Sequence, residues 1–130
     1  MIVVDTSLFV EAQRGRHAAR ERLVELLRSE DVAVSAMTVL ELLAVPRLSA
    51  RWARFYAGVF AAIEILDLDA RSAETGARLA GDMARRGLRL HNSDAAVAGC
   101  AARNGAALLV TSDADFTELR GLRVEYVQPS

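Results

Sequence analysis

Lysine is absent from this chain of 130 residues, and all sixteen of its basic residues are arginines. Mechanisms that require a lysine, such as a Walker A phosphate loop or a Schiff base, are therefore excluded. Arginine can still hold a phosphate group through two parallel hydrogen bonds. The net charge of −1 provides no global positive field, although it allows a local basic rim around an acidic site.

Cysteine and long hydrophobic runs are also scarce. The one cysteine, Cys100, cannot form an internal disulfide, and we interpret it as a small buried apolar residue. No apolar stretch is long enough to cross a membrane, and the first residues lack the basic and apolar segments of a signal peptide. We therefore expect a cytoplasmic protein. The length and the 52% of hydrophobic residues predict one domain over residues 1–130.

Short apolar runs alternate along the chain with segments of helical periodicity. Strands are expected at 2–5, 32–34, 63–66, 106–110 and 124–127. Helices are expected at 7–13, 16–30, 38–45, 47–62, 69–86 and 95–103. This alternation predicts a three-layer α/β/α fold around a mainly parallel sheet of about five strands.

Two of these helices carry additional patterns. Segment 47–62 holds Trp52, Phe55, Tyr56 and Phe60, which either pack against neighbouring elements or form a partner-binding surface. In segment 69–86, four alanines between residues 73 and 84 predict a stripe for close helix packing.

Acidic residues interrupt several apolar segments, although an unpaired carboxylate is costly to bury. Asp5 directly follows Ile-Val-Val, and Glu41 lies within Val-Leu-Glu-Leu-Leu. Asp94 precedes a long run of uncharged residues, and Asp113 and Asp115 follow the fourth strand. Because the carboxyl ends of parallel strands lie at one edge of a sheet, we expect Asp5 and Asp113 to lie close together.

Each of four acids also has a purely structural explanation. Asp5 can cap the following helix, and Glu41 can lie on the one solvent-exposed edge of its helix. Asp94 can be stabilised by a helix dipole, and Asp113 can be a turn residue. We favour a shared site, because a pocket of carboxylate oxygens suits Mg²⁺ or Mn²⁺. Zinc is disfavoured, since the cysteine and the two histidines show no ligand spacing.

Four segments place these acids in a recognisable order. They are Val-Val-Asp5-Thr-Ser, Ser35-Ala-Met-Thr-Val-Leu-Glu41-Leu, Asn92-Ser-Asp94-Ala-Ala-Val-Ala and Leu109-Val-Thr-Ser-Asp113-Ala-Asp115-Phe116. Together they resemble PIN-domain ribonucleases, most of all the VapC toxins of bacterial toxin–antitoxin pairs. The resemblance spans essentially the whole chain. In one departure, the segment after Asp94 carries small residues where the family usually has bulky Ile or Leu.

The resemblance implies a role for each acid. Asp5, Glu41, Asp94 and Asp113 correspond to the family's acidic quartet, with Asp115 as a second candidate for the fourth position. Asp5, Asp94 and Asp113 would hold Mg²⁺ or Mn²⁺ directly or through water. Glu41 would orient or deprotonate the water that attacks an RNA phosphodiester.

Hydroxyl and guanidinium groups complete the expected site. Thr6, Ser7 and Thr111 match positions where the family carries hydroxyls near the metal. Arginines on the rim could grip the RNA backbone, and the candidates are Arg14, Arg47, Arg85, Arg86 and Arg89. The resemblance further implies a structured RNA substrate such as transfer or ribosomal RNA, a homodimer, and a VapB-like antitoxin that covers the site.

Two rival functions fit a similar sheet. A haloacid-dehalogenase-like phosphatase or a receiver domain would use Asp5 as a covalent nucleophile. Both rely on a lysine, and the former also needs an aspartate where Ser7 stands. The other alternative is a PIN domain that only binds RNA or protein, against which the four intact acids argue.

Overall fold

The computed structural model describes residues 1–29 and 31–130, and its strands form one sheet in the order β3-β2-β1-β4-β5. The strands are β1 (Ile2–Val4), β2 (Val32–Ser35), β3 (Glu64–Leu66), β4 (Leu108–Thr111) and β5 (Val124–Tyr126). All four pairings are parallel, so the carboxyl ends of the strands lie at one edge. The predicted parallel sheet is confirmed.

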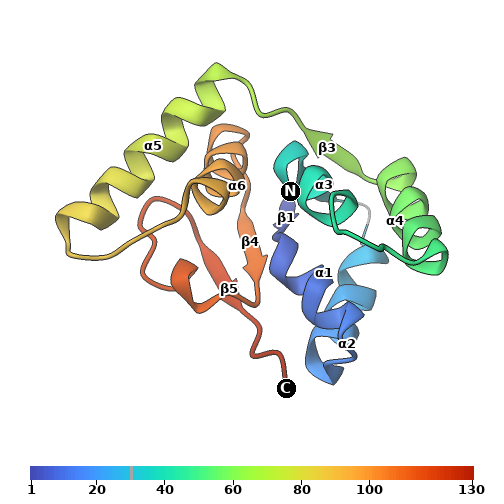
Figure 1. Cartoon of the computed structure of the whole chain (residues 1–130). Helices are drawn as coiled ribbons and strands as arrows, with labels where there is room; N and C mark the ends of the chain where they lie inside the picture. The colour runs from blue at the N-terminus through green and yellow to red at the C-terminus, as the bar shows by residue number, and fades with distance from the viewer. Residues whose placement is uncertain (30) are drawn as a thin grey trace.

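Helices cover both faces of this sheet (Figure 1). They are α1 (Thr6–Gln13), α2 (His17–Leu27), α3 (Ala36–Leu43), α4 (Ala50–Ala62), α5 (Ala70–Arg85) and α6 (Asn92–Arg103). Neighbouring side chains of β1 point to opposite faces, as the pleat requires. Val3 packs into the apolar cluster under α5 and α6, and Val4 packs into the cluster under α1, α2 and α4. The predicted three-layer α/β/α fold is therefore confirmed.

Capping residues move several helix boundaries away from the predicted positions. Helix α3 starts at Ala36 because the Ser35 hydroxyl accepts a backbone N–H of its first turn. Helix α4 starts at Ala50, since Arg47 adopts a left-handed φ of 60° and Ser49 caps the helix. Helix α6 starts at Asn92, three residues early. Helix α2 ends at Leu27, and its predicted end at residue 30 lies outside the described residues.

The aromatic side chains of α4 divide between the core and the surface. Tyr56 is fully buried, and its ring meets that of Phe9 edge-on with the ring centres 6.2 Å apart. Phe55 is 38% exposed. Packing therefore explains Tyr56, while Phe55 stays available at the surface.

The closest approach of α5 and α6 occurs at glycines. A Cβ atom at Gly76 would lie 2.3 Å from a backbone oxygen of α6, and one at Gly99 would lie 2.2 Å from a backbone oxygen of α5. The predicted alanine stripe is confirmed in part, because Ala80 packs against the core, whereas Ala73 and Ala77 are exposed beside α6. This close contact explains the small residues that follow Asp94, since larger side chains would separate the two helices.

Cys100 is fully buried in the cluster between the sheet and α6, as its interpretation as an apolar residue required. Within residues 1–29 and 31–130, no helix combines the length and the apolar character needed to cross a membrane.

Candidate metal centre

The carboxyl edge of the sheet borders a cavity of about 230 Å³. Its wall includes Asp5 after β1, Glu41 from α3, Asp94 from α6 and Asp113 after β4. These four acids come from positions up to 108 residues apart (113 − 5). They meet because β2, β1 and β4 are neighbours in the sheet and end at the same edge.

Asp5 is a buried carboxylate that is held by hydroxyl groups. Its Oδ2 atom accepts hydrogen bonds from the Ser7 hydroxyl at 2.6 Å and the Thr111 hydroxyl at 2.9 Å. Oδ2 also accepts the Ser7 backbone N–H at 3.3 Å, so the helix-cap explanation of Asp5 is correct as well. Burial raises the pKa of Asp5 above its usual value, although these hydrogen bonds oppose the shift. In the described part of the chain, no hydrogen bond engages Oδ1.

Asp94 lies in the first turn of α6 and faces the other acids across the cavity. Burial is the main reason that the pKa of Asp94 rises from 3.8 to about 7. The negative charges of Asp5, Asp113, Glu41 and Asp115 raise it further, in that order. An aspartate with this pKa marks a place where negative charge is poorly compensated by the protein itself.

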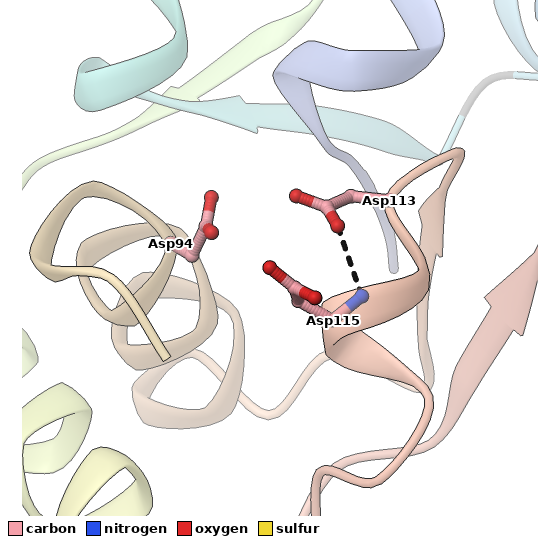
Figure 2. Close-up of side chains that lie close together, drawn as sticks. All are labelled: Asp94, Asp113 and Asp115. Carbon is pink, nitrogen blue, oxygen red and sulfur yellow. Dashed lines mark hydrogen bonds between the residues drawn. The ribbon is translucent and has the colours of Figure 1, made fainter. Parts of the chain in front are cut away.

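Asp113 and Asp115 both approach Asp94 from the segment that follows β4 (Figure 2). One carboxylate oxygen from each of the three residues lies within 4.8 Å of the other two. Asp113 Oδ1 accepts the Asp115 backbone N–H at 2.9 Å, which caps a 3-10 turn at Ala114–Phe116. Asp113 lines the cavity, whereas Asp115 is exposed and is not among the described lining residues.

Glu41 is anchored by Thr6, whose hydroxyl oxygen lies 2.8 Å from Glu41 Oε1. The expected supporting hydroxyls thus bind carboxylates: Thr6 binds Glu41, while Ser7 and Thr111 bind Asp5. Thr111 also accepts the Asp113 backbone N–H at 2.9 Å. The hydroxyls therefore connect the acids that follow β1 and β4.

Glu11 also lines the cavity, although the sequence had not indicated it as a site residue. Its carboxylate binds Arg14 at 3.0 Å and Arg16 at 3.5 Å, so that two guanidinium groups lie beside the acidic wall. Glu11 follows Ser7 by four residues in the same helix, which places both side chains on one face. The spacing of four residues between Ser7 and Glu11 is the sequence feature that could have indicated Glu11 as a site residue.

The donor set of this centre fits a hard divalent cation. The cavity offers carboxylate and hydroxyl oxygens, and no histidine or cysteine is among its described lining residues. Oxygen ligands of this kind favour Mg²⁺ or Mn²⁺ over zinc. The raised pKa of Asp94 supports the same conclusion, because a cation would compensate the charge that these carboxylates share.

Comparison with protein families gives one match over most of the chain. The profile of the PIN domain matches residues 2–122. The chain belongs to the PIN domain family. Among curated proteins, none matches this PIN domain by sequence.

Several solved structures with the same fold are described as VapBC or VapC proteins. VapBC2 from Rickettsia felis, bound to a promoter DNA fragment, is similar with a TM-score of 0.79 and 22% identity, over 98% of this chain and 100% of that one. VapBC-5 from Mycobacterium tuberculosis has a TM-score of 0.63 and 28% identity, over 96% and 95%. The sarcin–ricin loop cleaving toxin VapC20 from M. tuberculosis has a TM-score of 0.69 and 18% identity, over 95% and 99%.

Proposed function

We propose that this PIN domain is a Mg²⁺- or Mn²⁺-dependent endoribonuclease and the toxin of a VapBC-type pair. The observation that carries the proposal is the convergence of Asp5, Glu41, Asp94 and Asp113 on one cavity, with the pKa of Asp94 raised to about 7. The fold shared with VapBC complexes and with an RNA-cleaving toxin supports it.

Each acid has a distinct task in the proposed reaction. Asp5, Asp94 and Asp113 would hold the cation, which lowers the pKa of a bound water and stabilises charge that develops on the phosphate. The hydroxyls of Ser7 and Thr111 orient Asp5 through Oδ2, which leaves Oδ1 for the cavity. Glu41 orients the attacking water and takes its proton.

Arg14 and Arg16 are the arginines that the structure favours for contact with the RNA backbone. Both bind Glu11 on the cavity wall and remain largely exposed, with 65% and 57% of their side chains accessible. Arg86 is a weaker candidate, because it binds Asp82 and a backbone carbonyl. Phosphates of RNA would meet the two exposed guanidinium groups beside the acidic centre.

A VapB-like antitoxin and a second copy of the chain are the proposed protein partners. Exposed apolar side chains support an interaction role, since Leu40 is 59% exposed and Leu43 is 47% exposed on α3. We expect the isolated protein to sediment as a homodimer. Co-expression with a DNA-binding protein encoded next to it should yield a stable complex that does not cleave RNA.

Cleavage of total RNA by the purified protein tests the proposed activity. The wild-type protein should cleave RNA in Mg²⁺ and stop cleaving when EDTA is added. Asp5→Asn should be inactive under both conditions. If wild-type protein leaves RNA intact, the enzyme proposal fails and the RNA- or protein-binding alternative takes its place.

Expression without an antitoxin tests the proposed role as a toxin. Growth should slow when the wild-type chain is induced, and Asp94→Asn should relieve this effect at equal protein level. Equal toxicity of the two proteins would contradict the assignment of the site.

A further inference from the structure

Three hydroxyl groups connect the end of β2 to the Glu41 carboxylate. Ser35 Oγ lies 3.3 Å from Thr38 Oγ1. Thr38 Oγ1 lies 2.9 Å from Thr6 Oγ1, and Thr6 Oγ1 lies 2.8 Å from Glu41 Oε1. Ser35 and Thr38 are 0% exposed, so protein groups rather than water must satisfy their hydroxyls.

The direction of each hydrogen bond follows from the number of available protons. A carboxylate only accepts, so Thr6 gives its single hydroxyl proton to Glu41. Thr38 therefore donates to Thr6, and Ser35 donates to Thr38. Ser35 Oγ in turn accepts the Thr38 backbone N–H at 3.1 Å, which caps α3. The hydroxyl protons of Ser35, Thr38 and Thr6 thus all point along this series of hydrogen bonds toward Glu41.

We propose that Thr38 is a positioning residue for Glu41, a role that rests on the proposed task of Glu41 at the attacking water. The Thr38 hydroxyl fixes the rotation of the Thr6 hydroxyl, so that its proton faces Glu41 Oε1. Aligned hydrogen bonds of this kind polarise and strengthen one another. In the described residues no hydrogen bond engages Oε2, which remains for the water. Thr38 acts through Thr6 and does not touch the substrate.

A purely structural role for Thr38 makes different predictions. Thr38 lies in the first turn of α3 and is fully buried. If its role were purely structural, loss of its hydroxyl would weaken the helix and the core and would have no separate effect on catalysis. A positioning role requires in addition that catalysis suffers while substrate binding does not. The two roles therefore separate in kcat and KM.

Steady-state cleavage of one RNA substrate in saturating Mg²⁺ measures this separation. Thr38→Val keeps the shape of the side chain but removes the hydroxyl, and it should lower kcat about tenfold with KM unchanged, as expected for a lost hydrogen bond to a charged network. Thr38→Ser should restore most of kcat. In a Glu41→Gln background, Thr38→Val should cause little further loss, because both changes remove the same function.

Ser72→Ala is the matched control, since it removes a buried hydroxyl on α5 that is remote from the cavity. It should leave kcat unchanged. An unchanged kcat in Thr38→Val, or an equally low kcat in Thr38→Ser, would overturn the positioning role.

Urea unfolding keeps the proposal testable if the wild-type protein cleaves no RNA, an outcome that would refute the proposed function itself. Thr38→Val and Thr6→Val should each lower the urea midpoint, and the double variant should lose less than the sum. Additive losses would show that the hydroxyls of Thr38 and Thr6 do not stabilise each other. The inference would then fail independently of the activity.

Discussion

Asp69 and Asp94 both stand at the start of a helix in this PIN domain, yet their carboxyl groups have opposite properties. Asp69 caps α5 and accepts the Ser72 backbone N–H at 2.8 Å. Hydrogen bonds from Ser72, assisted by Arg103 and Arg71, hold the pKa of Asp69 below its usual value. Burial and neighbouring carboxylates raise the pKa of Asp94 to about 7.

The cavities beside these two residues differ in the same way. The cavity next to Asp69 has about 250 Å³, similar to the 230 Å³ of the candidate metal centre, and it also contains acids. Arg103 is part of the wall of the cavity next to Asp69. No arginine is among the described residues that line the candidate metal centre, and the nearby Arg14 and Arg16 are paired with Glu11. We therefore expect Asp94 and not Asp69 to be a metal ligand, because the charge of Asp94 is left for a cation to compensate. An aspartate at a helix start does not reveal this difference by itself.

The largest expected difference between the two aspartates is in RNA cleavage. Asp94→Asn should lower kcat/KM by at least about 100-fold, because the proposed ligand set of the cation would lose one charge. Asp69→Asn should cleave like the wild-type protein. Parallel cleavage assays in Mg²⁺ measure both variants, and an equal loss in the two would remove the distinction between the cavities.

The acids of the candidate site could largely be predicted from the sequence, because acids in apolar segments are unusual. The order of strands and helices, the parallel sheet and the meeting of Asp5 with Asp113 all follow from apolar periodicity and the shared edge of parallel strands. For this reason the resemblance to PIN domains and the fold agree with the structure.

Long-range packing explains what the sequence did not reveal. The contact of α5 with α6 uses Gly76 and Gly99, whereas Ala73 and Ala77 of the predicted stripe lie beside this contact and are exposed. The position of Glu11 at the cavity and the contact of Thr38 with Thr6 were not predicted either. Their importance depends on which neighbours the fold brings to them, and local spacing gives only a weak signal for that.

A smaller difference is expected between the two acids that follow β4. Asp113 lines the cavity, whereas Asp115 is exposed. We therefore expect Asp113→Asn to lower kcat/KM about tenfold more than Asp115→Asn, since both oxygens approach Asp94 but only one residue borders the cavity. Cleavage kinetics of the two variants at saturating Mg²⁺ would decide which residue is the fourth acid of the site. The reverse order would assign the fourth position to Asp115.

The smallest expected effect is on thermal stability without metal. The folded state raises the pKa of Asp94 from 3.8 to about 7, so it binds a proton more tightly than the unfolded chain. The contribution of Asp94 to stability therefore falls as pH rises from about 4 to about 7. In EDTA at pH 8, Asp94→Asn should melt roughly 5 °C above wild type, and the gap should close near pH 4.

Asp69 should show the opposite dependence on pH. Its pKa is lowered by folding, so its contribution to stability is present at neutral pH and is lost as the pH falls through the folded pKa. Asp69→Asn should therefore melt below the wild-type protein at pH 7 and approach it in acid. Melting curves of both variants that run parallel to wild type would contradict the electrostatic contrast.

Calorimetric titration of the metal-free protein with Mn²⁺ tests the central claim most directly. If the converging carboxylates form a cation site, wild-type protein and Asp69→Asn should bind Mn²⁺ equally, and Asp94→Asn should lose most of the binding. Undetectable binding to the wild-type protein, or equal binding by all three proteins, would contradict the account.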